Sequence, residues 1–248
     1  MTQEHPQTAR IGFLYPGHAA EDDYRRLGRH VLPPADVHLI HTDFLEDAHT
    51  VPALAEMGSE PRLAAGAREL ADHGVESVLW ASTSASFVLG LEGIRRQIDA
   101  LEKALCVPAS TTAMAFARAV TLINARRVAI AATYPEDVAS LFRVFLEHFD
   151  IEVVHMTGQG ITTAAEAGTL GRDDVLGMAR DNNHPDAEAL LIPDTALHSA
   201  AWLMELEHTV GKPVLTANQV SFWEALRLCG KLRPQKGLGT LFELTPWI

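Results

Sequence analysis

The stretch that decides the fold is Val128-Ala-Ile-Ala-Ala-Thr-Tyr-Pro135, because a similar run, Ile11-Gly-Phe-Leu-Tyr-Pro16, stands near the start of the chain. Both runs are short and apolar and end in an aromatic residue followed by proline, which is typical of buried strands that lead into a loop. The repeat continues along the chain, since Trp80-Ala-Ser-Thr-Ser-Ala85 has a counterpart in Ile192-Pro-Asp-Thr-Ala-Leu197, and Val107-Pro-Ala-Ser-Thr-Thr112 has one in Val214-Leu-Thr-Ala-Asn-Gln219. The similarity is one of pattern, and two duplicated halves are its simplest interpretation.

Eight apolar runs predict strands, at residues 11–15, 37–40, 75–81, 107–109, 128–132, 151–155, 189–192 and 214–217. Helical patterns lie between most of them, and the clearest repeats at i, i+3, i+4 and i+7 through Val138, Leu141, Phe142, Phe145 and Phe149. This alternation predicts an α/β fold of two pseudo-symmetric Rossmann-like lobes, each with a mostly parallel four-stranded sheet flanked by helices. We expect the lobes to span residues 1–122 and 123–248, with the active site in the cleft between them.

Composition excludes several classes of protein. The chain has 248 residues, 47% of them hydrophobic, which is enough to bury a sizeable core. No apolar stretch approaches the roughly 18 residues that cross a bilayer, and the polar start lacks a signal-peptide core, so we expect a cytoplasmic protein without a membrane partner. A formal net charge of -12 argues against a nucleic-acid partner. Two cysteines are too few for a disulfide framework.

Two loops hold the polar residues that suggest chemistry. Ser82-Thr83-Ser84 follows a predicted buried strand, where hydroxyls and backbone N–H groups at a helix N-terminus attract anions such as a substrate carboxylate. Tyr134-Pro135-Glu136-Asp137 follows the equivalent strand of the second half. On local grounds, helix capping is the favoured interpretation of both loops. Their predicted convergence is what favours a binding role.

Three segments carry a family resemblance, which covers roughly residues 10–242. They are Val78-Leu-Trp-Ala-Ser-Thr-Ser-Ala-Ser-Phe87, Ala132-Thr-Tyr-Pro-Glu-Asp-Val138 and Ser221-Phe-Trp-Glu-Ala-Leu-Arg-Leu228. They resemble the corresponding segments of arylmalonate decarboxylases and maleate isomerases, within the Asp/Glu racemase superfamily. A further run, Glu21-Asp-Asp-Tyr-Arg-Arg-Leu27 followed by Ile40-His-Thr-Asp43, more closely resembles the maleate-isomerase-like proteins of ectoine utilisation.

The resemblance implies a cofactor-free site that stabilises an enolate-like intermediate while protons move on and off a carbon next to a carboxylate. It implies that Thr83, Ser84 and Tyr134 hydrogen-bond the carboxylate, joined by backbone N–H groups near Thr195. Asn218 aligns with a position that often holds a binding amide. Tyr15 and Pro16, which end the first repeat as Tyr134 and Pro135 end the second, complete the expected substrate-binding set. For Phe222 and Trp223 we expect core packing instead of substrate contact.

The departure from the family pattern concerns its cysteines. Racemases and isomerases of this superfamily place one cysteine at the end of each equivalent strand, and the decarboxylase keeps only the second. Here Ser82 and Asp194 stand at those positions. Cys106 and Cys229 align with neither, so we interpret them as buried structural thiols. A racemisation that uses two thiolates does not fit this chain.

Asp194 is the first candidate catalytic residue, although an ionised carboxylate would repel a substrate carboxylate unless it were protonated or paired. It can transfer the proton that cysteine handles in relatives, or activate water; the alternative is that it caps the helix that contains His198, Trp202 and Leu206. His198 lies one turn further on and is a candidate to share its proton. Ser82 is the second catalytic candidate, but no histidine lies near it in sequence to act as a base, which favours binding or capping.

The remaining expectations concern cofactors, metals, partners and the reaction. His18 and His41 lack metal-ligand spacing, and Gly158-Gln-Gly-Ile161 lacks a dinucleotide fingerprint, so we expect neither metal nor cofactor. We expect a cofactor-independent decarboxylase or isomerase acting on a small carboxylate or dicarboxylate, with decarboxylation favoured because it needs only one proton donor. A hydratase or hydrolase that uses Asp194 to activate water, and a carboxylate-binding pseudoenzyme, are the alternatives. A homo-oligomer formed through late aromatic residues or the tail 245–248 is left open.

Overall fold

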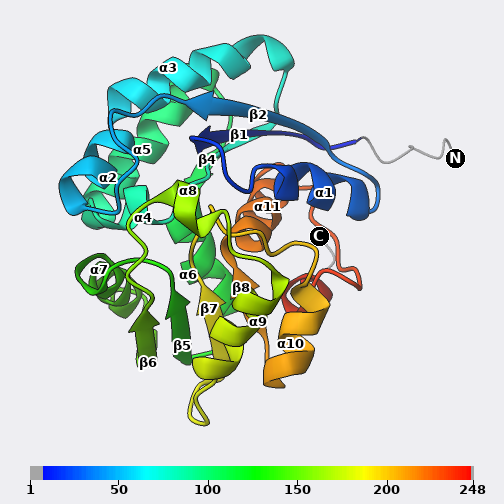
Figure 1. The fold of residues 1–248 in the computed structure, drawn as a ribbon. Helices are drawn as coiled ribbons and strands as arrows, with labels where there is room; N and C mark the ends of the chain where they lie inside the picture. The colour runs from blue at the N-terminus through cyan, green and yellow to red at the C-terminus, as the bar shows by residue number, and fades with distance from the viewer. Residues whose placement is uncertain (1–7, 247–248) are drawn as a thin grey trace, which may run out of the picture.

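The computed structural model describes residues 8–246, which form two four-stranded, all-parallel sheets flanked by helices (Figure 1). The strand order in the first sheet is β2-β1-β3-β4, with bounds β1 Arg10–Pro16, β2 Asp36–Thr42, β3 Ser77–Trp80 and β4 Ala109–Thr111. The second sheet repeats this order as β6-β5-β7-β8, with bounds β5 Arg127–Ala132, β6 Glu152–Gly158, β7 Ala189–Ile192 and β8 Val214–Thr216. The predicted fold class is confirmed, together with all eight predicted strands.

Helices connect successive strands, as parallel pairing requires, and the last two helices follow β8. Their bounds are α1 Asp22–His30, α2 Val51–Met57, α3 Glu60–Leu70, α4 Ser84–Phe87, α5 Gly90–Leu105, α6 Thr112–Leu122, α7 Glu136–Glu147, α8 Ala164–Ala167, α9 Arg172–Asp181, α10 Leu203–Val210, α11 Ala217–Leu228 and α12 Thr240–Glu243, with a short 3₁₀ turn at Ala71–His73. The predicted helical pattern at 138–149 falls on α7, which buries Val138, Phe142 and Phe145 as expected. No helix of residues 8–246 combines the length and apolarity that a membrane crossing needs.

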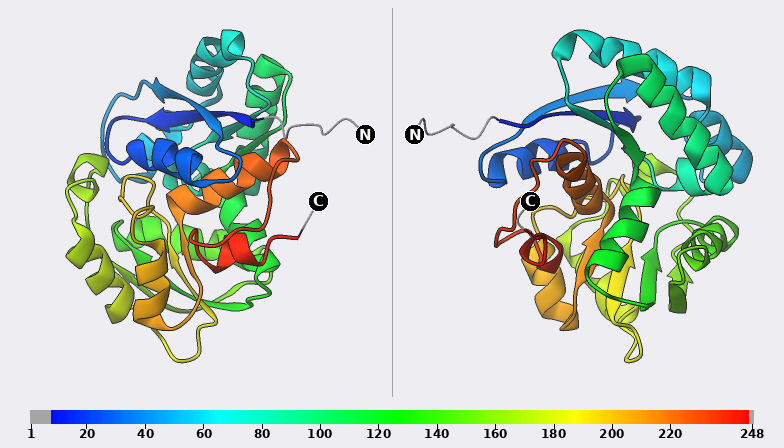
Figure 2. Two further views of the ribbon diagram at one scale, coloured as in Figure 1. Left: turned by 90° about the vertical axis from the view of Figure 1, so that its right-hand side faces the viewer. Right: turned by 180° about the vertical axis from the view of Figure 1, so that it is seen from behind.

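The two halves share one hydrophobic core instead of folding as separate bodies. Helix α11 belongs to the second half of the sequence but packs against α1, α6 and the first-sheet strands β1, β3 and β4 (Figure 2). The Phe13 and Phe222 rings stack with centroids 6.1 Å apart, and the Ser77 hydroxyl donates to the carbonyl of Ala225 at 2.8 Å. The boundary that we predict between residues 122 and 123 falls between α6 and β5, and α11 packs across it.

The predicted packing role of two aromatic residues is also confirmed. Phe222 and Trp223 lie on α11 and are buried in the shared core. They are therefore unavailable as an exposed surface for oligomerisation. Of the tail at 245–248, Trp247 and Ile248 lie outside the described residues.

The carboxyl ends of the parallel strands determine where a ligand can bind. Strands β1, β3, β5 and β7 are almost wholly buried, so their polar chemistry begins only where each strand ends. After β1 the chain turns sharply at Gly17, whose φ of 68° is unfavourable for a residue with a side chain. A Cβ there would also lie 3.0 Å from the Phe44 ring. This turn directs the β1–α1 loop toward the loops of the second half.

Candidate active site

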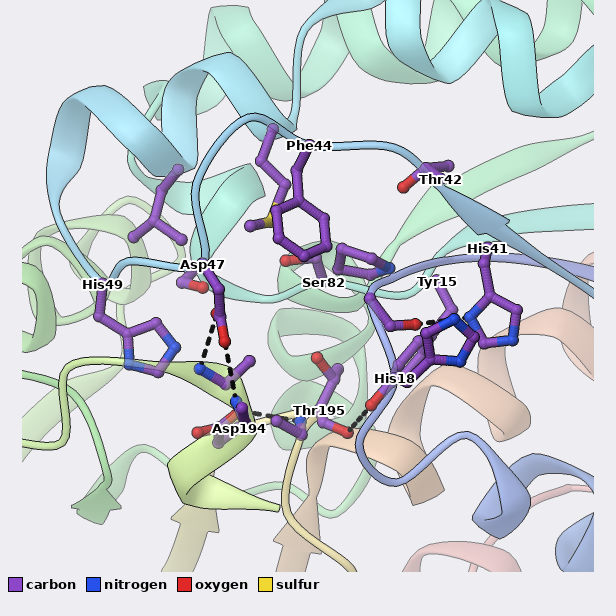
Figure 3. A pocket seen from close by; sticks show the side chains of 18 of the residues that line it. Tyr15, His18, His41, Thr42, Phe44, Asp47, His49, Ser82, Asp194 and Thr195 are labelled. Carbon is purple, nitrogen blue, oxygen red and sulfur yellow. Dashed lines mark hydrogen bonds between the residues drawn. The ribbon is translucent and has the colours of Figure 1, made fainter.

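A cavity of about 490 Å³ lies where these loops meet (Figure 3). Six of the nine residues that we predicted for the site line it: Tyr15, Pro16, Ser82, Ser84, Asp194 and Thr195. Residues 41–57 of the first half and Ala164–Ala165 of the second complete the wall. The remaining three predicted residues, Thr83, Tyr134 and Asn218, lie behind the wall and are fully or almost fully buried.

Asp194 follows β7 and reaches the cavity with only 4% of its surface exposed. One carboxylate oxygen, Oδ2, accepts a short hydrogen bond from the hydroxyl of Thr133, and the other accepts from the backbone N–H of Ala196 at 2.9 Å. The second contact closes a local Asx turn. Asp194 does not cap the helix that follows, because α10 begins only at Leu203. Both oxygens are thus held in place by residues of the second half, which follow β5 and β7.

His198 does not share a proton with Asp194, the role for which it was a candidate. Its Nε2 atom lies 2.9 Å from Oδ1 of Asp22, on the first half of the chain. The turn at 194–197 is not helical, so the one-turn helical spacing that the prediction assumed does not exist.

The peptide groups on both sides of Asp194 are held by two buried tyrosines, which we call the tyrosine clamp (Tyr15 and Tyr134). The Tyr134 hydroxyl donates to the carbonyl of Pro193 at 2.7 Å, and the Tyr15 hydroxyl donates to the carbonyl of Thr195 at 3.0 Å. Tyr15 also accepts from the backbone N–H of Ala20 at 3.0 Å. Each phenol proton is thus used by the backbone, and the clamp positions Asp194.

Burial keeps both clamp residues in the neutral, donating form. Desolvation raises the pKa of Tyr134 well above its ordinary value, and the nearby charge of Asp194 raises it further. Desolvation also raises the pKa of Tyr15, with Tyr24 and Asp194 contributing. The hydrogen bonds to the Asp194 loop therefore persist throughout the physiological pH range.

The Ser82–Ser84 loop combines capping with free hydrogen-bond donors. The Ser82 hydroxyl accepts from the backbone N–H of Ala85 at 3.3 Å, as the capping alternative predicted, and no described histidine contacts it. The backbone N–H groups of Ser84 and Thr195 donate to no described residue. The buried Thr83 hydroxyl likewise has no partner within residues 8–246. The loop therefore has unused donors, although only those on the cavity wall can reach a ligand directly.

Asn218 supports the site from behind. Its amide donates to Oδ2 of Asp23 at 3.1 Å and to the carbonyl of Leu197 at 3.3 Å. The same Asp23 oxygen accepts from the backbone N–H groups of Ser199 at 2.8 Å and Ala200 at 3.0 Å. Burial raises the pKa of Asp23, while these hydrogen bonds oppose that increase. Asn218 thus anchors the chain just after Asp194 to α1, instead of facing the cavity as a binding amide would.

A segment that the sequence did not indicate closes the cavity. This lid loop, residues 43–49, belongs to the first half and makes hydrogen bonds to residues of the second half. The carboxylate oxygens of Asp47 accept from the backbone N–H groups of Ala164 at 2.9 Å and Ala165 at 3.0 Å. The backbone N–H of His49 donates to the carbonyl of Thr162 at 2.7 Å. Only the partners of this loop across the cavity identify it as a lid.

The charges that line the cavity are acidic groups and histidines, with no lysine or arginine among its described lining residues. The ionisable lining residues are Asp43, Asp47, Asp194, His18, His41 and His49. An anionic ligand would therefore be held by hydroxyl and N–H donors. One such donor was not predicted: the Thr42 hydroxyl is buried on the wall and has no partner among the described residues.

The interpretation of both cysteines as buried thiols is only partly correct. Cys106 is exposed, because it ends α5 in the left-handed conformation with φ of 55° and lies outside the helix packing. Cys229 is half-buried, and burial raises the pKa of its thiol. Neither cysteine lines the cavity. The site thus has no thiol among its wall residues.

Comparison with known proteins supports the resemblance inferred from sequence. The family model of arylmalonate decarboxylase matches residues 53–242. A curated arylmalonate decarboxylase from Bordetella bronchiseptica is 30% identical over 183 residues, which cover 71% of this chain and 75% of that protein.

Solved structures share the fold. The maleate isomerase Iso from Pseudomonas putida S16 has a TM-score of 0.86 at 20% identity and covers 96% of this chain and 100% of its own. A crystal structure of arylmalonate decarboxylase has a TM-score of 0.77 at 22% identity, over 95% and 100% of the two chains. A Nocardia farcinica maleate cis-trans isomerase, a cysteine-to-serine mutant with a covalently bound succinylcysteine intermediate, has a TM-score of 0.86 at 22% identity, over 97% and 100%.

Proposed function

Since the chain belongs to the arylmalonate decarboxylase family, we propose that it is a lyase or isomerase of small carboxylates in which Asp194 transfers the proton. The reaction passes through an enolate-like intermediate and needs no cofactor, and decarboxylation is the favoured form. The observation that carries the proposal is the placement of Asp194, a buried carboxylate on the cavity wall with both oxygens oriented.

The absence of a thiol from the cavity wall sets this chain apart from its relatives. One Nocardia farcinica isomerase carries a succinylcysteine intermediate, so a cysteine of that protein becomes covalently attached during its reaction. No described lining residue of this cavity is a cysteine, and Ser82 has no histidine partner to activate it. Proton transfer by Asp194 is the chemistry that the remaining groups support.

In the decarboxylation the bond between the central carbon and one carboxylate breaks, and carbon dioxide leaves. Its electron pair passes to the carbon and is delocalised onto the retained carboxylate. The free N–H groups of Ser84 and Thr195 and the hydroxyl of Thr42 are the donors available to that oxygen charge. Protonated Asp194 then gives its proton to the carbon and regains one from solvent.

A second function, activation of water, is favoured by a specific contact. Both oxygens of Asp194 accept hydrogen bonds, and such bonds stabilise an ionised carboxylate. An ionised Asp194 would act as a base toward water, as in a hydratase or hydrolase. Product identity separates this function from decarboxylation.

The test is turnover of a panel of malonates, maleate, hydroxy acids and amino acids, followed by proton NMR in D₂O. This detects both new products and exchange of a substrate C–H proton. Asp194→Asn should lower kcat by about 10²- to 10⁴-fold, the range of general acid–base catalysis. Asp43→Asn is the matched control, because it removes the same charge from the same cavity at an exposed position. A native protein that binds a carboxylate without turnover or exchange would be a binding protein, and the proposal would be wrong.

A further inference from the structure

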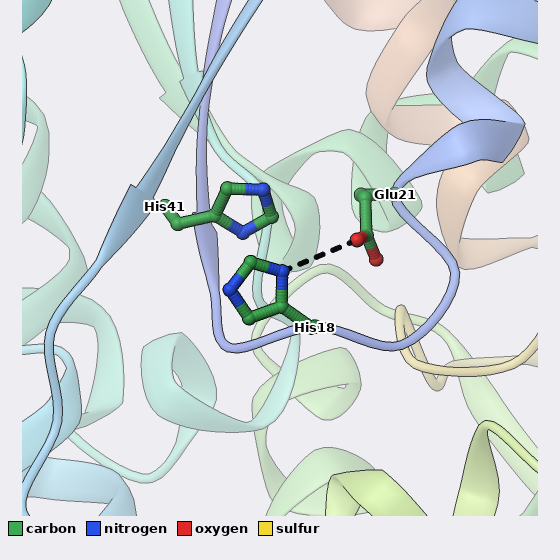
Figure 4. A group of neighbouring side chains, drawn as sticks. All are labelled: His18, Glu21 and His41. Atoms are coloured by element: carbon green, nitrogen blue, oxygen red, sulfur yellow. Dashed lines mark hydrogen bonds and ion pairs between the residues drawn. The ribbon is translucent and has the colours of Figure 1, made fainter.

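Three potential metal ligands converge at one side of the cavity (Figure 4). They are His18 and Glu21 from the β1–α1 loop and His41 from the end of β2. One ligand atom of each lies within 4.8 Å of the other two. His18 and His41 also belong to the cavity wall, so the group faces the same space as Asp194 (Figure 3). Sequence spacing did not predict this grouping, because the third ligand comes from a neighbouring strand.

Hydrogen bonds already orient two of these side chains for coordination. Nδ1 of His41 lies 2.5 Å from the carbonyl oxygen of Gly17. A carbonyl can only accept, so Nδ1 carries the proton and Nε2 keeps a free lone pair, the arrangement usual for metal-bound histidine. Oε2 of Glu21 accepts from the backbone N–H of Ala19 at 2.8 Å, while Oε1 lies 3.4 Å from Nδ1 of His18. His18 is the exposed member of the group, with 74% of its side chain accessible to solvent.

We propose that His18, Glu21 and His41 bind a divalent transition-metal ion, Zn²⁺ above all. Two imidazole nitrogens and one carboxylate oxygen suit Zn²⁺ and its neighbours in the first transition row, whereas Mg²⁺ and Ca²⁺ prefer sites made of oxygen alone. Three protein ligands leave the fourth position of a tetrahedral ion open. Because His18 and His41 line the cavity, an anionic group of a ligand bound there can occupy that position.

A bound ion also explains why the rings of His18 and His41, which the proposed reaction does not use, lie so close together on the cavity wall. The rings of His18 and His41 lie with centroids 3.9 Å apart in a cavity that contains no lysine or arginine among its described lining residues. An ion bound by both rings and Glu21 would supply positive charge to the cavity. It would attract the carboxylate substrate that Asp194 by itself repels.

The chain offers a matched control for the test. His38 lies on the same strand, β2. Its Nε2 atom is 3.0 Å from Oδ2 of Asp36, and the centroid of its ring is 4.8 Å from that of the His73 ring. This second group of two histidines and an acid does not bring three ligand atoms as close together as His18, Glu21 and His41 do, and it is not on the cavity wall. Substitution there removes a histidine of similar surroundings without touching the proposed site.

The experiment is titration of the full chain, without an added histidine tag and after EDTA treatment, with Zn²⁺ alone by calorimetry. Co²⁺ is added separately as a spectroscopic probe of coordination. We expect one ion per chain, and His18→Ala, Glu21→Gln and His41→Ala should each weaken its binding at least about tenfold, the lower limit for loss of even an outer-shell partner. His38→Ala should leave binding unchanged. His18→Ala keeps the fold because the side chain is mostly exposed, and circular dichroism checks this for all variants.

Absence of stoichiometric Zn²⁺ binding would overturn the proposal, as would equal weakening by His38→Ala. These outcomes are independent of the function proposed for Asp194. Turnover by the EDTA-treated protein that is lost in Asp194→Asn would support that function even if no ion binds.

Discussion

Removal of one hydroxyl from the tyrosine clamp is the sharpest test of how the site is held together. Tyr15→Phe keeps the buried ring but deprives the carbonyl of Thr195 of its donor and the N–H of Ala20 of its acceptor. Each buried polar group left without a partner costs about 1–3 kcal/mol, so two such groups should lower the free energy of unfolding by about 2–6 kcal/mol. Tyr134→Phe leaves only the carbonyl of Pro193 without its donor, so it should lower the free energy of unfolding by about half as much.

The comparison is well matched, because both clamp tyrosines are 1% exposed and Phe preserves the ring in each. Tyr24→Phe is the control, since the Tyr24 hydroxyl is buried without a partner among the described residues and its removal should be nearly neutral. Urea unfolding measures all three variants. The double variant of the clamp should show a coupling energy of about 0.5–3 kcal/mol, because both hydroxyls hold the same short loop.

The clamp also predicts a loss of turnover beyond the loss of stability. With the peptides on either side of Asp194 released, kcat should fall while the protein is still folded at low temperature. An equal loss of stability in Tyr134→Phe and Tyr15→Phe would contradict this role of the clamp. So would native kcat in either clamp variant on a substrate whose turnover needs Asp194.

Three further predictions rest on separate contacts. First, burial raises the pKa of all three tyrosines above the ordinary value of 10, so as the pH rises the unfolded chain loses these protons before the folded chain does. The free energy of unfolding should therefore be unaffected below pH 10 and fall above it by about 1.4 kcal/mol per pH unit for each tyrosine. Urea unfolding across that pH range measures this. Second, Asp47→Ala removes the acceptor for two lid contacts, so amide hydrogen exchange of residues 43–49 and 159–165 should become about 5- to 30-fold faster, with no such change in β5. Exchange rates equal to those of the native protein would refute the lid. Third, Glu224→Gln leaves Arg118 and Arg227 without their buried carboxylate. Because both arginines are partly exposed, the free energy of unfolding should fall by less than about 3 kcal/mol. An unchanged unfolding midpoint would show that the two ion pairs contribute nothing to stability.

The architecture was predictable because it depends on short-range pattern. Apolar runs identified all eight strands, and the repeat of Tyr15-Pro16 in Tyr134-Pro135 indicated the duplication that the identical strand orders now show. Most strand bounds differ from the predicted ones by one to three residues, and β4 is shifted as a whole, since it covers 109–111 instead of 107–109. Pro108 explains the shift, because a residue without a backbone N–H cannot donate to the sheet.

The site was predictable only as far as the ends of strands indicate it. Ser82 and Asp194 each follow a buried strand, and both line the cavity. Asn218 also follows a strand, yet it points to Asp23 on α1, since α11 packs across the boundary between the halves. Strand position thus located the loops but not the direction of each side chain.

The sequence by itself determined the α/β class, the two-fold repeat and the family, because each of these depends on residue type and on spacing along one element. Only the tertiary structure decided what surrounds Asp194. The clamp hydroxyl of Tyr15 reaches Thr195 from 180 residues away, the lid contact of Asp47 spans 117, and His41 joins His18 from an adjacent strand. Such partners are selected by how two packed halves meet, and hydrophobic periodicity, which reports only the buried face of each element, does not encode them.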